Sequence, residues 1–251
     1  MKNILVIWRK EMRIYFVSPI AYHLLAFTGV IFGFFFSVAV SIFVGRGMAA
    51  QGMPMDVNEW VIRPLLMNIS VIGLFVTPMI GMRLFAEEKF SGTIELLMTS
   101  PVRDLEIVLG KWLGALTLYA SLLAISALNL GLLFIWGRPD WKPVLVGYLG
   151  LLLQGGCLLA IGTFISTLTR NQIVAALTTF DLCLLLWVFD WVSAYETAAW
   201  ARVLSYISVL THFEPFAKGV LDSKDVIFYV SVIFLGLFLT SRSMESLRWR
   251  A

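Results

Sequence analysis

The chain has 251 residues, of which 59% are hydrophobic and 14% are charged, and its formal net charge is +3. Soluble domains carry about 25% charged residues, so this composition excludes an ordinary soluble protein and indicates an integral membrane protein. The basic residues stand at the ends of apolar segments rather than in one patch, so no nucleic-acid partner is expected. Both cysteines, Cys157 and Cys183, fall inside apolar segments, which argues against a structural disulfide.

The first segment, residues 1–18, is too charged for a cleavable signal peptide and predicts an interfacial helix. Spaced at 100° per residue, its apolar residues share one face of a helix and its basic residues the other. The apolar face holds Ile4, Leu5, Trp8, Met12 and Tyr15, and the basic face holds Lys2, Arg9, Lys10 and Arg13. The alternative is a basic flank that only orients the first membrane span.

Six apolar segments are long enough to cross a membrane, which takes roughly 20 residues in a helix. They predict an all-α integral membrane fold, with residues 1–251 as a single transmembrane domain. The expected spans are residues 19–44, 61–82, 105–136, 144–168, 173–191 and 226–240. Pro78 is expected to kink the second span shortly before its end.

The distribution of cationic residues predicts that both termini are cytoplasmic, because cytoplasmic loops are enriched in Lys and Arg. With that topology, twelve of the nineteen cations lie on the inner side and seven on the outer side. The inner set is Lys2, Arg9, Lys10, Arg13, Arg83, Lys89, Arg103, Lys111, Arg170, Arg242, Arg248 and Arg250. The outer set is Arg46, Arg63, Arg138, Lys142, Arg202, Lys218 and Lys224.

The longest charged interruption lies between the second and third spans, in residues 83–104. Its part from Arg83 to Pro101 reads RLFAEEKFSGTIELLMTSP. These charges exclude the stretch from hydrocarbon, so we expect it in water, with the first turns of the third span around Lys111 also in the cytoplasm. A helix that breaks at Gly92 and restarts at Thr93 predicts a short docking element, whereas the alternative is a solvated loop that only anchors the topology.

The same stretch resembles the signature of type-2 ABC permeases, the membrane subunits of ATP-driven exporters. The resemblance rests on Pro78–Arg83, Glu87–Glu88–Lys89, Gly92–Thr93, Glu95–Leu96–Leu97 and Ser100–Pro101. It is nearest to the small bacterial permeases of the gliding-motility and nitrous-oxide-reductase-maturation kind. It implies a subunit in the bacterial inner membrane whose loop is a coupling helix.

The resemblance also implies partners. A separate cytoplasmic ABC ATPase would bind ATP and Mg, and a second permease copy would complete the path within membrane lipid. A periplasmic accessory protein is a further partner of such systems. The residues that would receive the motion of the ATPase are Glu87, Glu88, Gly92, Thr93, Glu95, Leu96 and Leu97.

The chain shows no catalytic or nucleotide-binding motif of its own. A phosphate-binding loop needs the pattern GxxxxGK[ST], and at the Gly110–Lys111 pair the first glycine is replaced by Leu105. Motifs of the CxxC, HExxH and GxSxG types are also absent. We therefore expect neither an enzyme active site nor a cofactor or metal in this chain.

Asp181 stands near the middle of the fifth span, where an ionised carboxylate costs about 2.5–3.5 kcal/mol. It is expected to be protonated, paired or exposed to a water-filled path, with Asn129, Gln154 and the neighbouring Thr178 and Thr179 as candidate partners. Two roles remain open, a polar point on the substrate route or the subunit seam, and a hydrogen bond that fixes packing.

Residues 193–225 are too polar to cross the membrane and predict two short outer helices, which the resemblance implies are re-entrant. His212 and Glu214 form a candidate pH-sensitive pair there. Two other functions compete with the permease, an ion-coupled secondary transporter and a membrane scaffold for a surface or motility machine. The single central acid and the lack of a clear internal repeat count against the secondary transporter.

Overall fold

The computed structural model describes residues 2–49, 56–99, 101–136, 139–195 and 199–248, and every regular element in these ranges is a helix. In chain order they are α1 (Lys2–Val17), α2 (Pro19–Ala49), the π-helical turn η1 (Asn58–Ile62), α3 (Arg63–Gly81), α4 (Arg83–Phe90), α5 (Ile94–Thr99), α6 (Asp104–Trp136), α7 (Trp141–Leu168), α8 (Gln172–Tyr195), α9 (Ala199–Ile207), α10 (Val209–Ala217) and α11 (Ser223–Arg248). The all-α prediction is confirmed.

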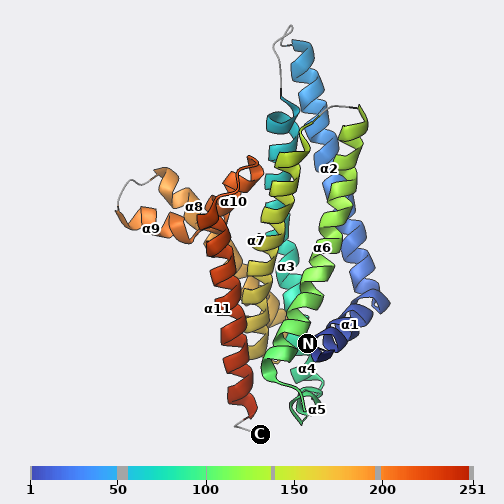
Figure 1. Ribbon diagram of the computed structural model, residues 1–251, viewed down its shortest axis with the longest axis vertical. Helices are drawn as coiled ribbons and strands as arrows, with labels where there is room; N and C mark the ends of the chain where they lie inside the picture. Colours follow the sequence, from blue (N-terminus) through green and yellow to red (C-terminus); the bar gives the residue numbers. More distant parts are fainter. Residues whose placement is uncertain (1, 50–55, 100, 137–138, 196–198, 249–251) are drawn as a thin grey trace.

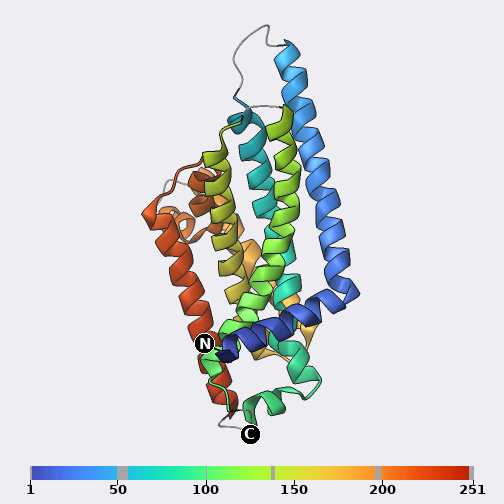
Figure 2. The same cartoon turned by 45° about the vertical axis from the view of Figure 1, so that its right-hand side comes forward.

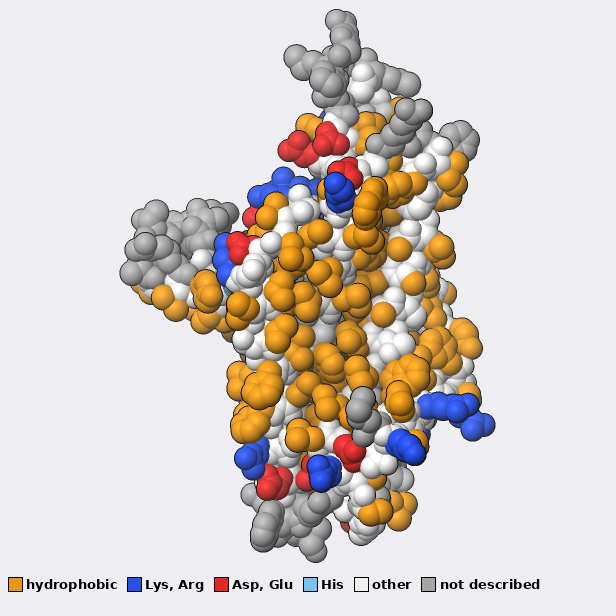
Figure 3. Space-filling view, viewed as in Figure 1, with side chains coloured by type: hydrophobic (Ala, Val, Ile, Leu, Met, Phe, Trp, Pro, Cys, Tyr) orange, Lys and Arg blue, Asp and Glu red, His pale blue; other side chains and the backbone are white. Residues whose placement is uncertain are grey.

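Six of the described helical segments are long and apolar enough to span a membrane, as predicted. They cover Ala21–Gly47, Asn58–Phe90, Asp104–Ile135, Trp141–Leu168, Gln172–Trp191 and Ser223–Leu247. On the face that Figure 3 shows, apolar side chains cover the middle of the molecule, and most acidic and basic side chains lie toward its two ends. The last helix is longer than the predicted 226–240 because charged residues at both of its ends continue the same helix.

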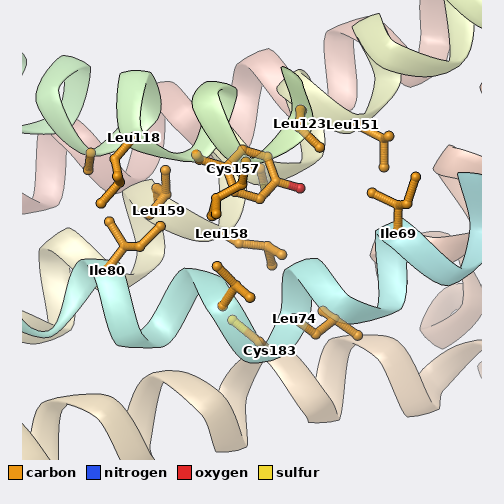
Figure 4. Close-up of a cluster of buried hydrophobic side chains, with 14 of the residues drawn as sticks. Ile69, Leu74, Ile80, Leu118, Leu123, Leu151, Cys157, Leu158, Leu159 and Cys183 are labelled. Atoms are coloured by element: carbon orange, nitrogen blue, oxygen red, sulfur yellow. The ribbon is translucent and has the colours of Figure 1, made fainter. Parts of the chain in front are cut away.

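Helix α7 lies at the centre of the bundle and packs against α3, α6, α8, α10 and α11 (Figure 1). Figure 4 shows why it is buried: Cys157, Leu158 and Leu159 of α7 lie among apolar side chains of three neighbouring helices. Those neighbours include Leu118 and Leu123 of α6, Ile69, Leu74 and Ile80 of α3, and Cys183 of α8. The two cysteines are free, as the sequence predicted.

Several helices begin at the caps that their sequences provide. The Asp140 carboxylate accepts a hydrogen bond from the Lys142 backbone N–H at the start of α7, and the Asn171 side chain accepts one from Ile173 at the start of α8. Ser208 caps α10 in the same way. Such caps satisfy backbone donors that the first turn of a helix leaves unpaired.

Glycines on α7 allow its neighbours to approach closely. Gly81 of α3 and Gly162 of α7 meet backbone to backbone, since a Cβ atom added at Gly81 would stand 3.3 Å from the Gly162 Cα. The tightest of these contacts is at Gly155, where an added Cβ would stand 2.1 Å from the ring of Tyr119 on α6. Tyr119 is buried, so its ring has little room to move.

Replacing Gly155 with alanine is expected to destabilise the fold by about 1–3 kcal/mol, the usual range for overpacking a dense core. Thermal unfolding of the purified protein in detergent measures this loss. The control is Gly131→Ala on α6, where an added Cβ meets nothing within 4 Å and helix propensity favours alanine by about 1 kcal/mol. Equal unfolding temperatures for the two variants would show that the Tyr119 contact is not tight.

Helices α1, α4 and α5 lie together at one end of the molecule, near both ends of the chain (Figures 1 and 2). Figure 2 shows α1 crossing this end at a steep angle to the long helices, and it packs mainly against α6. The second short pair, α9 and α10, lies toward the opposite end. The described parts of residues 1–18, 83–104 and 193–225 contain short helices, and the interfacial, coupling and re-entrant roles expected for these segments stay predictions.

Candidate functional site

The loop between the second and third spans consists of two helices separated by a turn. Helix α4 ends at Phe90, α5 begins at Ile94, and Gly92 between them has a φ of 72°. Side chains other than glycine rarely adopt this left-handed conformation. The Ser91 hydroxyl contacts the Glu87 carbonyl and the Thr93 hydroxyl, both at 2.9 Å. The break predicted at Gly92 is confirmed, and Thr93 directly precedes the second helix.

The turn and α5 present an exposed surface, which we call the docking tip and define as Phe90, Thr93, Glu95 and Leu96. Leu96 is 74% exposed and Phe90 is 80% exposed. Leu97, also predicted as a coupling residue, is half-buried and packs against the core. Phe90 was missed by the sequence reasoning, because an aromatic residue beside a glycine turn looks the same in sequence whether it is buried or exposed.

Helix α4 is not surrounded by water, which corrects the prediction for the stretch as a whole. Its residues Leu84, Phe85 and Ala86 are buried, and the helix packs against α7 and α8. Lys89 of α4 also donates to the Thr167 carbonyl of α7, so the bundle holds α4 through polar as well as apolar contacts. This arrangement attaches the loop rigidly to the helices that it connects.

The two adjacent glutamates of α4 form ion pairs with basic residues of the same chain. Glu87 forms a two-point ion pair with Arg83, with oxygen–nitrogen distances of 2.8 and 3.1 Å. Glu88 lies 2.9 Å from Lys111 Nζ of α6 and 3.3 Å from Lys10 Nζ of α1. Glu88 therefore ties the loop to α6 and α1, whereas Glu87 pairs within α4 and, with 42% of its side chain exposed, remains part of the surface.

Lys111 is the centre of a buried ion cluster, which we define as Glu11, Glu88 and Lys111. Its ammonium group lies 2.8 Å from the Glu11 carboxylate of α1 as well as contacting Glu88. The side chain of Lys111 is only 2% exposed, because α1 and α4 cover this part of α6. The cluster joins α1, α4 and α6, because the buried Lys111 ammonium group pairs with a carboxylate from each of the other two helices.

Glu11 was not singled out from the sequence, although it is the one acidic residue in a basic helix. It lies on the face of α1 that packs against α6, together with Tyr15, which is also buried. Trp8 on the same helix donates a hydrogen bond of 2.9 Å to Thr117 of α6. Leu5, expected on the apolar face, is 62% exposed, so the contact face of α1 is rotated from the predicted one.

A serine of α7 connects the second span to the loop. Met82 separates α3 from α4, and the Ser166 hydroxyl donates to its carbonyl at 3.0 Å. The same oxygen accepts hydrogen bonds from the backbone N–H groups of Phe85 and Ala86, at 3.0 and 2.9 Å. These two N–H groups belong to the first turn of α4, where backbone donors have no acceptors within the helix itself. Ser166 therefore caps α4 from a different helix.

The intramembrane polar residues predicted to meet do not do so. Gln154 of α7 is buried and accepts a hydrogen bond of 2.8 Å from Ser70 of α3. Asn129 lines a small cavity between α2, α3 and α6. Asp181 lies on an exposed face of α8, so its pairing with Asn129 or Gln154 is wrong for the single chain. The tertiary structure satisfies Gln154 inside the bundle and leaves Asp181 on its surface.

The outer pair proposed for His212 is also corrected. His212 lies 2.6 Å from Asp225 at the start of α11, and both side chains are buried. Glu214 instead contacts Arg63 at 2.9 Å and Lys218 at 2.7 Å. The hydrogen bond from Lys218 is the main cause that lowers the pKa of Glu214.

Taken together, six membrane-length helices among the described residues and a two-helix loop anchored to the bundle define a multi-pass membrane protein. Residues 37–225 match the family described as ABC-2 family transporter protein, and the chain belongs to that family. It is a membrane subunit of the ABC transporter class, and the family's subunits carry no ATPase site. The resemblance seen in the loop motif is thereby confirmed.

Two curated relatives share the same level of similarity. Both are named probable multidrug ABC transporter permease YbhR, one from Escherichia coli strain K12 and one from Escherichia coli O157:H7. Each is 26% identical over 170 residues, which cover 66% of this chain and 44% of the relative. The chain thus spans less than half the length of the relatives that it matches.

Proposed function

We propose that the chain is the permease subunit of an ATP-driven exporter in the bacterial inner membrane, driven by a separate cytoplasmic ATPase that binds ATP and Mg. The observation that carries this proposal is the bracing of the loop. Helix α4 is tied to α6 and α1 by the buried ion cluster and to α7 by Ser166, while the docking tip is exposed. A force applied to the docking tip is therefore transmitted to several spans through short, buried contacts.

The proposed topology places the docking tip and both termini in the cytoplasm. The support is the excess of cations at that end, twelve against seven at the other. With this orientation the tip faces the compartment that contains ATP, and α9 and α10 lie at the outer side. The relatives are named as multidrug permeases, which favours small organic molecules as cargo.

The proposed assembly contains a second permease copy. Helices α2 and α8 are mostly exposed along their membrane-spanning parts, and Asp181 is on the exposed face of α8. Contact with lipid would cost an ionised Asp181 about 2.5–3.5 kcal/mol. A second copy facing α8, with water or polar groups at the seam, removes this penalty.

Co-purification with a co-expressed ATPase tests the coupling role. The double variant Phe90→Ala, Leu96→Ala is expected to lower the retained ATPase more than about tenfold, because burying side chains of this size is worth about 1.5–3 kcal/mol each. Its unfolding temperature is expected to stay unchanged, since both side chains are exposed in the free chain.

The matched control is Leu168→Ala, at the same end of the molecule and 62% exposed, but outside the docking tip. It is expected to retain the ATPase as the native chain does. Equal retention by the double variant and the control would remove the docking tip from the interface. Failure of the native chain to bind any ABC ATPase encoded beside it would overturn the permease proposal itself.

A further inference from the structure

A large apolar cavity lies between α2 and α3, with α1 across one end and α6 behind it. Its volume is about 590 Å³, within the range of about 300–1,000 Å³ that is typical of small-molecule sites. Its walls are Leu24, Phe27 and Ile31 of α2 and Phe75, Val76 and Met79 of α3. Phe27, Phe75 and Met79 are more than half exposed, so the cavity is open at its side.

The polar groups of the cavity are confined to one end. Tyr15 of α1 and Arg83 of α4 line that end, together with His23 near the start of α2. Arg83 has five N–H donors, and Glu87 accepts from two of its nitrogens. Burial is the main cause that raises the pKa of Tyr15, so its hydroxyl stays a neutral donor.

The lining favours a ligand head that accepts hydrogen bonds. None of the described residues that line the cavity is acidic, whereas Arg83 contributes a cation. The partner of Arg83 is itself a carboxylate, so the guanidinium already has the geometry that a carboxylate or phosphate requires. A ligand head at this point would share or displace Glu87.

We propose that this cavity binds a single-chain amphiphile, with its hydrocarbon chain between α2 and α3 and a carboxylate or phosphate head at Arg83 and Tyr15. The chain would enter through the open side, and the head would stay at the level of α1. Because Arg83 begins α4, an occupied head site acts directly on the helix that leads to the docking tip.

Two kinds of molecule share this chemistry: a lipid of the surrounding membrane and a cargo molecule that the protein transports. As cargo, it deepens the proposed function and rests on it. As a membrane lipid, it would be a resident ligand and independent of transport.

Native mass spectrometry of the purified chain without an ATPase tests binding separately from the proposed function. The probes are palmitate and palmitoyl lysophosphatidate, and hexadecylamine provides a chain of the same kind with a cationic head. The acidic probes are expected to form one adduct per chain, and the amine at least tenfold less. Equal binding of the amine would overturn the assigned head site.

Two variants fill the cavity from different helices, Ile31→Trp on α2 and Met79→Trp on α3. Both are expected to lower palmitate binding at least tenfold, and the second requires little repacking because Met79 is 51% exposed. The control is Val30→Trp, which is 73% exposed on α2 and outside the cavity lining. Equal palmitate binding by the three variants would overturn the site. The site would also be overturned if Ile31→Trp or Met79→Trp disrupted the permease dimer but left palmitate binding unchanged.

The source is decided by two further readings on the same protein. A tightly held lipid that co-purifies, and is lost in Ile31→Trp, supports a resident ligand. A change in the ATPase rate of the assembled complex on adding palmitate, absent in Ile31→Trp, supports cargo. If no ATPase assembles, the proposed function fails while the binding test still stands.

Discussion

Replacing Lys111 with methionine is expected to lower the free energy of unfolding by about 3–5 kcal/mol. The methionine would fill a similar volume but leave the buried Glu11 carboxylate without its cation, and Glu88 with only the exposed Lys10 as a cationic partner. One oxygen of Glu88 is already buried with no hydrogen-bond partner among the described residues, so no spare donor near it can replace Lys111. Thermal unfolding in a fixed detergent and at fixed pH measures the loss.

Lys10 provides the matched control, because it contacts the same Glu88 oxygen from an exposed position, with 52% of its side chain accessible. Lys10→Met is expected to change stability by less than about 1 kcal/mol, since solvent screens exposed ion pairs. Adding Glu11→Gln to Lys111→Met should recover part of the loss by removing one orphaned charge. Similar unfolding temperatures for Lys111→Met and Lys10→Met would contradict the buried ion cluster.

The buried ion cluster is expected to transmit movement of α4 to the bundle as well as to stabilise the fold. In the complex with its ATPase, Lys111→Met should leave hydrolysis running while transport falls, because α4 would lose its buried ion pair with α6. The measurement is the ratio of substrate moved to ATP hydrolysed, at a temperature where the variant is folded. An unchanged ratio would assign the cluster to stability alone.

Ser166→Ala is the second substitution with a large expected effect. It removes one small hydroxyl and leaves the backbone N–H groups of Phe85 and Ala86 buried without their acceptor. Each unsatisfied donor costs about 1–3 kcal/mol, so the total loss should exceed that of an ordinary hydrogen bond, which is worth about 1 kcal/mol. Hydrogen exchange at the start of α4, together with thermal unfolding, measures this effect.

Thr163→Val on the same helix is the control for Ser166→Ala. The Thr163 hydroxyl is buried and donates only to the Leu159 carbonyl of its own helix, which already accepts within the helix. Its removal leaves no orphaned donor, and the substitution keeps the volume. If Thr163→Val destabilised the protein as much as Ser166→Ala, the cap on α4 would not be the cause.

Local sequence was sufficient for the six spans and for the break in the loop. Each span could be predicted because an apolar segment must be long enough to match the thickness of the hydrocarbon layer. This constraint acts on each segment separately. Gly92 could be predicted because a left-handed turn is a property of a single residue and its immediate neighbours. The cap at Asn171 has the same local origin.

The internal partners of the loop could not be found in this way. Glu88 and Lys111 lie in different helices, and Glu11 is 100 residues from Lys111 in the chain. A glutamate that binds an ATPase and one that braces a loop have the same sequence signature. Which role applies depends on the helix packed behind it, and the packing places Lys111 there.

By itself, the sequence determined that this chain has six segments long and apolar enough to cross a membrane, and a short helical loop with the signature of an ABC permease. Composition and hydrophobic length decide these features, because water and lipid act on each segment wherever its neighbours are. Only the tertiary structure decided that Glu88 faces inward, that Ser166 caps α4, and that Asp181 stays on the surface. Those outcomes depend on pairing between distant helices, where burial makes each charge and backbone donor find a specific partner.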